Sequence, residues 1–201
     1  MDFVDLERHF APISKDKDAE LDWSLHLGRK YGNWLNWTEL LERRRVVLLA
    51  EALCGKTKEL EQRAIILKGQ GHPAFYVRIE DLIDRGFIAA MRTDDAQLFD
   101  MWKKSETGDA WFFLDSVDEA RINNKSFPGA LRTLSNELGN DSLNRAFIIV
   151  SCRVSDWKGK SDREAIESEL PFVDNLACHD RDEILLGPIF DKNTIPLNKV
   201  G

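Results

Sequence analysis

Cysteine is scarce in this sequence of 201 residues, which holds only Cys54, Cys152 and Cys178. An odd number of cysteines at such wide spacing excludes a disulfide framework and a CxxC metal knuckle. The four histidines are also scattered along the chain, so we expect no zinc site. A chain without a disulfide framework suits a reducing compartment, and we therefore expect a cytoplasmic protein.

The sequence also lacks a basic excess and a long apolar run. Lysine and arginine total 28 against 35 acidic residues, which gives a formal charge of −7. This balance argues against a dedicated nucleic-acid binder, which usually carries a strong basic excess. No apolar run is longer than 146–150, far too short to span a bilayer, and the charged residues 1–10 lack the apolar region of a signal peptide. We therefore expect neither a nucleic acid nor a membrane as a partner.

Short apolar runs alternate with amphipathic segments along most of the chain. Apolar runs bounded by charge indicate strands buried on both faces, whereas apolar residues at helical spacing indicate helices. We expect strands at 46–50, 75–79, 111–114, 147–150 and 184–186, and helices within 55–71, within 80–105 with one or two breaks, and at 127–138. The alternation predicts an α/β fold of three layers, with helices on both faces of a mostly parallel central sheet.

The first 42 residues differ in character from the rest, being polar with scattered aromatics. Rough helical spacing predicts short helices here, one of them capped by Thr38. We therefore expect an N-terminal helical extension, 1–42, before a core domain, 43–201. The aromatic residues include Trp23, Trp34 and Trp37.

Two features of this region have more than one interpretation. The tryptophans either pack against the edge of the sheet or form a surface for a partner protein. The arginine triplet 43–45 is expected at a solvated strand edge, with an acidic partner or a nucleic acid as the alternative.

A phosphate-binding loop is predicted between the first strand and the first helix. The motif GxxxxGK[ST] is typical of this position, and its last three residues are Gly55, Lys56 and Thr57. Gly55 would let backbone N–H groups approach phosphate, Lys56 would neutralise phosphate charge, and the Thr57 hydroxyl would bind Mg²⁺. The positive end of the helix would add to this site. The candidate nucleotide-binding residues are Ala50, Glu51, Ala52, Leu53, Cys54, Gly55, Lys56 and Thr57.

Two residues of the loop depart from the motif. Ala50 replaces the first glycine, and Leu53 stands where many phosphate loops have another glycine. If the backbone at position 53 needs a positive φ, leucine costs on the order of 1–2 kcal/mol there, whereas glycine adopts that conformation freely. We therefore expect weak nucleotide binding, and a higher affinity when Leu53 is replaced by glycine.

An acidic motif follows the third expected strand, which ends in Asp115. In a parallel sheet this aspartate emerges at the carboxyl edge, where ligands of open α/β folds bind, and we expect it to hold Mg²⁺ together with Thr57. Ser116 is small enough for the chain to pass close to the metal. We expect Glu119, with Asp118 in reserve, to orient or deprotonate the attacking water. Without the phosphate loop upstream, these residues would suit a solvated acidic turn.

A polar triplet follows the fourth expected strand. Ser151 is expected to contact the γ-phosphate or the attacking water. Arg153 is expected either to contact phosphate or to link the site to a neighbouring domain. A surface role for Arg153, with nearby acids such as Asp156 as its partners, is equally open.

Together these motifs resemble the NACHT branch of the STAND P-loop NTPases. That family carries an apolar strand followed by an aspartate, a small residue, an apolar residue and the pair Asp-Glu, and residues 114–119 match this pattern in full. The lead-in at 37–49 and the triplet 151–153 are also similar to bacterial members. The resemblance implies a P-loop NTPase fold, ATP and Mg²⁺ as cofactors, and a switch in which ATP binding promotes assembly and slow hydrolysis resets it.

Members of that family usually continue into a helical lid, a winged-helix segment and sensor repeats. None of these fits into the residues after Pro188, so we expect a fragment, a truncated chain or a small stand-alone relative. The resemblance then implies protein partners, or self-association, through the missing C-terminal regions. In bacteria such switches often serve antiviral defence or signalling.

The sequence leaves three functions open. The first is an ATPase switch, and the second is a protein-interaction scaffold that has lost nucleotide turnover through Ala50 and Leu53. The third is a fragment of a helicase-like or AAA-type motor. The sequence also leaves open whether the nucleotide is ATP or GTP.

Overall fold

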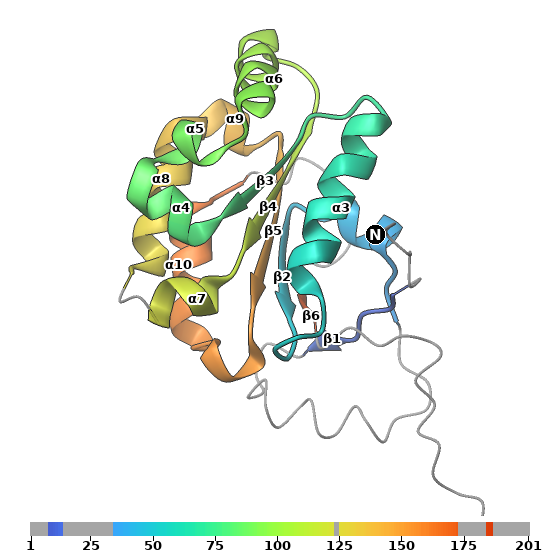
Figure 1. Ribbon diagram of the computed structural model, residues 1–201, viewed down its shortest axis with the longest axis vertical. Helices are drawn as coiled ribbons and strands as arrows, with labels where there is room; N and C mark the ends of the chain where they lie inside the picture. The colour runs from blue at the N-terminus through green and yellow to red at the C-terminus, as the bar shows by residue number, and fades with distance from the viewer. Residues whose placement is uncertain (1–7, 14–33, 123–124, 173–183, 187–201) are drawn as a thin grey trace, which may run out of the picture.

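The computed structural model describes residues 8–13, 34–122, 125–172 and 184–186. They form a mixed α/β fold around a six-stranded sheet with the strand order β1-β6-β2-β5-β4-β3 (Figure 1). The neighbouring strands from β6 to β3 are parallel, and β1 at the edge runs antiparallel to β6. The predicted α/β class with a mostly parallel sheet is therefore confirmed. Trp23 and most of the expected extension 1–42 lie outside the described residues.

The parallel strands bring their carboxyl ends to one edge of the sheet. Leu49 pairs with Cys152 between β2 and β5, and Leu114 pairs with Val150 between β4 and β5. The ends of β2, β5 and β4 are therefore neighbours. The strands are β1 Pro12–Ile13, β2 Arg45–Leu49, β3 Ala74–Arg78, β4 Ala110–Asp115, β5 Ala146–Cys152 and β6 Ile184–Leu186.

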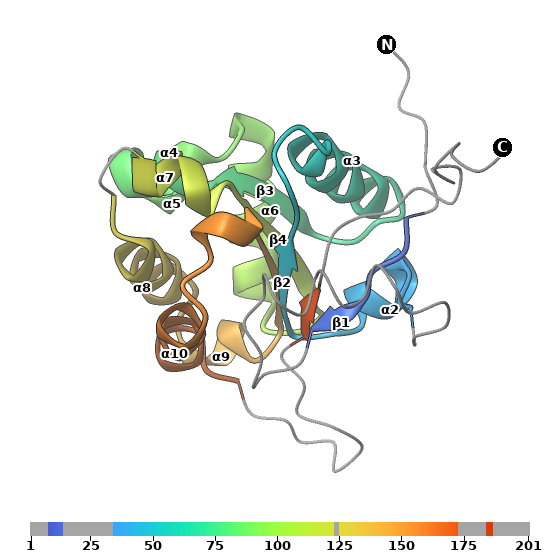
Figure 2. The ribbon, with the colours of Figure 1, turned by 90° about the horizontal axis from the view of Figure 1, so that it is seen from below.

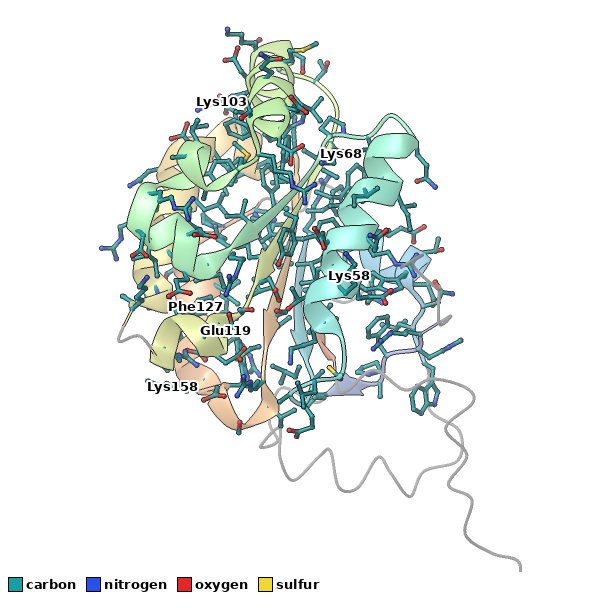
Figure 3. All side chains as sticks on the ribbon, in the orientation of Figure 1. Lys58, Lys68, Lys103, Glu119, Phe127 and Lys158 are labelled. Carbon is teal, nitrogen blue, oxygen red and sulfur yellow. The ribbon has the colours of Figure 1, made fainter. Side chains whose placement is uncertain are left out.

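The central strands are apolar throughout because both faces of the sheet are covered. Successive side chains of a strand point to opposite faces. Val46 and Leu48 of β2 accordingly enter one core cluster, whereas Val47 and Leu49 enter the other. Side chains fill the space between the sheet and the helices on either side (Figure 3).

Helices cover the two faces unequally. Figure 2 shows α3 and α2 on one side of the sheet and α4, α7, α8 and α10 on the other. The helices are α2 Trp37–Leu41, α3 Lys56–Gly69, α4 Ile79–Arg85, α5 Phe87–Ala90, α6 Thr93–Ser105, α7 Val117–Ile122, α8 Phe127–Leu138, α9 Asn140–Leu143 and α10 Lys160–Glu169, with a 3₁₀ turn at Val154–Asp156.

The described part of the N-terminal segment packs into the layer that contains α3. Phe10 is fully buried and forms backbone hydrogen bonds with Leu35 in both directions, at 2.7 and 2.8 Å. Its ring meets the Trp37 ring edge-on, with centroids 5.1 Å apart. Phe10, Leu35 and Trp37 share a core cluster with β2 and α3. These contacts fix the described N-terminal residues against α3.

Most expected elements are confirmed with shifts of one or two residues at their ends. The expected helix 127–138 is α8, and the expected fifth strand 184–186 is β6. The expected helical region 80–105 has two breaks, one at Gly86, where φ is +77°, and one at Met91–Arg92. Sequence patterns missed β1, α7 and α10, which are short or only weakly apolar.

Two local predictions were wrong. The N-cap of α2 is Asn36, not Thr38, because the Asn36 side chain accepts from the Glu39 amide while the Glu39 carboxylate accepts from the Asn36 amide. Arg45 of the arginine triplet is not at a solvated edge but only 4% exposed. It donates to the carbonyls of Leu143, Ala146 and Leu170, which replace water around the guanidinium.

Candidate functional site

Three loops meet at the carboxyl edge of β2, β5 and β4. Residues 50–55 follow β2, Arg153 follows β5, and Asp115 ends β4 just before α7. The loops converge because β5 lies between β2 and β4 in the sheet. The structure thus brings together the three motifs that the sequence singled out.

The phosphate-binding loop follows a left-handed path at two residues. Gly55 has a φ of +85° and caps α3, with no side-chain hydrogen bond to the helix start. Leu53 has a φ of +62° and a fully exposed side chain. The first amides of a helix have no partner within the helix, and they can bind an anion. The loop thus ends at a helix start whose amides have no side-chain cap, and leucine adopts the left-handed conformation at position 53.

The Lys56 side chain folds back over this loop. Its ammonium group donates to the carbonyl of Ala50 at 2.7 Å and to that of Glu51 at 3.0 Å. The positive charge therefore lies on the strand side of the loop, next to the carboxyl edge of the sheet. A phosphate bound there would compete with two neutral carbonyls for this charge.

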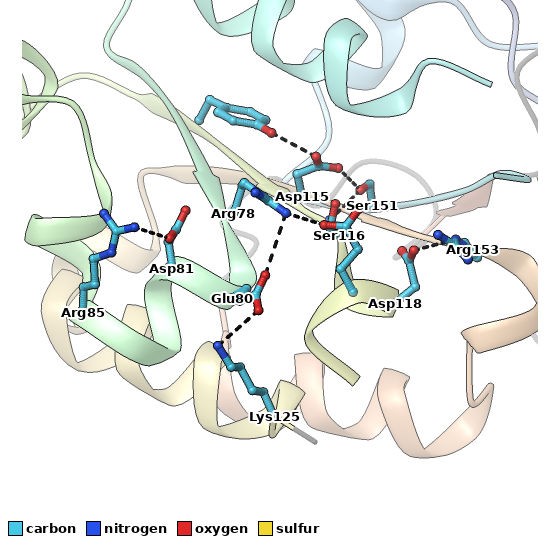
Figure 4. A network of polar contacts seen from close by, with 12 residues as sticks. Arg78, Glu80, Asp81, Arg85, Asp115, Ser116, Asp118, Lys125, Ser151 and Arg153 are labelled. Carbon is cyan, nitrogen blue, oxygen red and sulfur yellow. Dashed lines mark hydrogen bonds and ion pairs between the residues drawn. The ribbon is translucent and has the colours of Figure 1, made fainter. Parts of the chain in front are cut away.

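Asp115 projects to the same face of the sheet as α3. Phe113 and Ile149 belong to the core cluster on that face, so Asp115 and Ser151, each two residues further along its strand, point the same way. The Ser151 hydroxyl donates to Asp115 Oδ1 and accepts from the Ser116 amide at 3.0 Å. Ser151 therefore ties the end of β5 to the turn that follows β4 (Figure 4).

Tyr76 of β3 completes the surroundings of Asp115. Its hydroxyl donates to Asp115 Oδ2 at 2.9 Å, so both oxygens of the fully buried carboxylate accept hydrogen bonds. Burial, and then the neighbouring Asp115 charge, raise the pKa of the Tyr76 hydroxyl well above its ordinary value. Tyr76 therefore remains protonated and acts as a donor.

The turn at Ser116 directs the next acidic residues. Ser116 has a φ of +69°, which is uncommon for a residue with a side chain and is often found at functional sites. The turn begins α7, where Val117 enters the core. Successive helical residues project about 100° apart. Asp118 and Glu119 therefore leave α7 in different directions.

Asp118 faces the phosphate loop and the end of β5. Its Oδ2 lies 2.7 Å from Arg153 Nε, and its Oδ1 is buried without a hydrogen-bond partner. Burial raises the pKa of Asp118, whereas a weak contact of its carboxylate with its own backbone amide and the charges of Arg153 and Lys56 lower it. The residue is only 4% exposed. A buried carboxylate oxygen without a hydrogen-bond partner could accept a hydrogen bond from a bound water or coordinate a metal ion.

Glu119 instead faces β3. It forms an ion pair with Arg78, which also lies 3.8 Å from Glu80 (Figure 4). The Glu119 side chain is 40% exposed. The geometry therefore separates the two acids that the sequence treated as alternatives, with Asp118 next to the phosphate loop and Glu119 at the neighbouring strand.

The residues present fit a nucleotide-bound magnesium ion. Thr57 is exposed on the first turn of α3, directly after the loop at the carboxyl edge of the sheet. Among the described residues no three acidic, histidine or cysteine side chains group as metal ligands. Magnesium needs no such group, because one or two carboxylates plus substrate phosphates usually hold it. The bonds from Tyr76 and Ser151 favour a water-mediated contact with Asp115.

Sequence reasoning missed three residues of this site. Tyr76 and Arg78 lie in β3, which contributes no motif. The third is Arg8 in the N-terminal segment, whose side chain donates to the carbonyl of Cys54 in the loop after β2. Polar residues at alternate positions of an otherwise apolar strand were the available signal for Tyr76 and Arg78. No sequence pattern connects Arg8 to the phosphate loop.

Comparison with known proteins does not identify a family for this chain. No protein-family model and no curated protein match the chain. Among solved structures, the cytoplasmic domain of EssC is similar with a TM-score of 0.35 and 16% sequence identity, over 91% of this chain and 44% of that one. The chain thus spans less than half the length of that structure. None of the helices in the described ranges is long and apolar enough to cross a membrane.

Proposed function

We propose that this chain is a P-loop NTPase domain that binds ATP with Mg²⁺ and hydrolyses it slowly, as a molecular switch. The observation that carries the proposal is the meeting of a left-handed Gly55 at the start of α3 with the buried Asp115 and Asp118. A loop that offers amides to phosphate and a carboxylate that can hold a metal are the two halves of such a site.

Each residue has a distinct proposed role. Lys56 would exchange its two carbonyl partners for phosphate oxygens. Thr57 and Asp115 would hold Mg²⁺, which neutralises phosphate charge when bound. Ser151 would keep the Asp115 carboxylate oriented.

The geometry favours Asp118 over Glu119 as the group that orients the attacking water. Asp118 has an unpaired buried oxygen near Lys56, and its raised pKa brings it closer to that of a useful base. Arg153 forms an ion pair with Asp118, so a change in the charge of Asp118 would alter the contacts of the loop after β5. Glu119 is committed to Arg78.

The proposed place within the NACHT branch rests on the motif at residues 114–119, with the similar segments 37–49 and 151–153 in support. A role as an assembly switch in defence or signalling, with protein partners or copies of itself, follows from that resemblance. The role as an assembly switch also involves protein regions outside the site.

The experiment is a calorimetric titration of ATP with and without Mg²⁺. Lys56→Ala should weaken ATP binding by about 10- to 100-fold, because a hydrogen bond to a charged group contributes about 1.5–3 kcal/mol. Lys58→Ala is the matched control. Lys58 lies two residues after Lys56 in the first turn of α3, is largely exposed and pairs with Glu61. Equal affinities in the wild type and Lys56→Ala would contradict the proposal.

A second candidate function is a protein-interaction scaffold. Two observations favour it: both Asp115 oxygens already accept hydrogen bonds, and Leu53 exposes its whole side chain at the loop. An apolar side chain at that place suits contact with a protein better than contact with phosphate. Lack of ATP binding by a folded wild-type chain would favour the scaffold.

A further inference from the structure

Arg8 connects the N-terminal segment to the phosphate-binding loop. Its Nη1 donates to the carbonyl of Cys54 at 2.9 Å, across 46 residues of sequence. The residue is only 8% exposed. The backbone pairing of Phe10 with Leu35 anchors the chain two residues further on. Arg8 therefore approaches the loop from a fixed segment of the fold.

A buried carboxylate holds the Arg8 guanidinium in this position. Arg8 Nε lies 3.2 Å from Glu59 Oε2, and Glu59 Oε1 pairs with Arg63 at 3.0 Å. Glu59 is 2% exposed and lies on the first turn of α3. Two guanidinium groups, of Arg8 and Arg63, contact this one carboxylate.

The bond to Cys54 also sets the direction of the next amide. In a trans peptide the C=O and the following N–H point in opposite directions, and none of the described peptide bonds is cis. Because the Cys54 carbonyl points to Arg8, the Gly55 N–H points away from Arg8. A phosphate-binding loop needs its amides directed at the anion. The bond from Arg8 to the Cys54 carbonyl fixes the direction of the Gly55 amide.

Gly55 is matched to the arginine in a second way. A Cβ on this residue would lie 3.2 Å from Arg8 Nη2, a tight contact, and its φ of +85° also disfavours any side chain. The glycine of the motif therefore serves both the loop conformation and the close approach of Arg8.

We propose that Arg8 is a positioning residue of the phosphate site, which fixes the Cys54–Gly55 peptide. The proposal rests on the proposed nucleotide binding. It makes the N-terminal segment part of the site, so polyphosphate binding and the docking of this segment strengthen each other.

The test compares Arg8→Ala with Arg63→Ala. Both variants remove one arginine from Glu59, but only Arg8 contacts the loop carbonyl. Calorimetry with Mg–ATP and with pyrophosphate should show affinity about 10-fold lower in Arg8→Ala and nearly unchanged in Arg63→Ala. Amide NMR of the ligand-free chains should show a shifted Gly55 resonance in Arg8→Ala alone.

Each outcome either supports or contradicts the positioning role of Arg8. Equal losses of affinity in the two variants, or an unchanged Gly55 resonance in Arg8→Ala, would overturn the positioning role while leaving nucleotide binding intact. Absence of binding by the wild type would overturn the proposed function and this role together. If Arg8→Ala does not fold, Arg8→Gln and Arg63→Gln give the same comparison with less change in side-chain size.

Discussion

Replacing Leu53 by glycine tests whether the left-handed backbone at this residue lowers the stability of the fold or the affinity for nucleotide. Leu53 has a φ of +62°, and its side chain is fully exposed. The substitution therefore removes an unfavourable backbone conformation and no buried contact.

The expected gain in stability is small and positive. A left-handed conformation costs a leucine about 1–2 kcal/mol more than a glycine. Glycine also has more freedom in the unfolded chain, which offsets about 0.4–1 kcal/mol. The net gain is roughly 0.5–1 kcal/mol, or about 1–4 °C in Tm for a chain of this size. Urea unfolding of both proteins measures it directly.

Nucleotide affinity should change little, by less than about threefold or 0.6 kcal/mol. The reason is that a left-handed backbone that the loop holds both with and without nucleotide contributes equally to the two states. This prediction differs from the expectation from sequence that glycine raises affinity, and the same titration distinguishes the two. Glu106→Gly is a matched control, because Glu106 is exposed with a φ of +55° at the end of α6. An affinity gain of fivefold or more in Leu53→Gly without a stability gain would refute the reasoning.

Two further predictions concern the acidic residues. Asp118→Asn should retain ATP but slow its hydrolysis by about 10²- to 10⁴-fold, the usual range for a lost general base, while Glu119→Gln should turn over ATP nearly as the wild type does. A phosphate-release assay measures both, and the opposite ranking would return the role to Glu119. Tyr76→Phe frees one oxygen of Asp115, so it should increase the Mg²⁺-dependent part of ATP affinity by about 10-fold, because a hydrogen bond to a charged group contributes about 1.5–3 kcal/mol. Titrations with and without Mg²⁺ measure this part, and a decrease would show that Tyr76 helps to orient the carboxylate.

The elements that sequence predicted well are those whose pattern is local. The strand β2 follows from a run of apolar residues, and α8 follows from leucines at helical spacing. The carboxyl edge of the sheet then brings Asp115 and the phosphate loop together without any further information.

The parts that sequence missed depend on contacts between distant segments. Tyr76 reaches Asp115 only because β3 pairs with β4 in the observed register. The difference between Asp118 and Glu119 depends on how the turn at Ser116 rotates α7, which residue types do not encode. Arg45 was misjudged because its partners are backbone carbonyls, which every sequence contains.

The buried Arg45 has a consequence for how the molecule responds to acid. It lies at the start of β2, at the opposite end of that strand from the phosphate loop, and the carbonyls that surround it do not titrate. The hydrogen bonds to these carbonyls therefore persist at low pH, where ion pairs between arginines and carboxylates weaken. They keep the start of β2 tied to the start of β5 and to the ends of α9 and α10 when the charge of the acidic residues is lost.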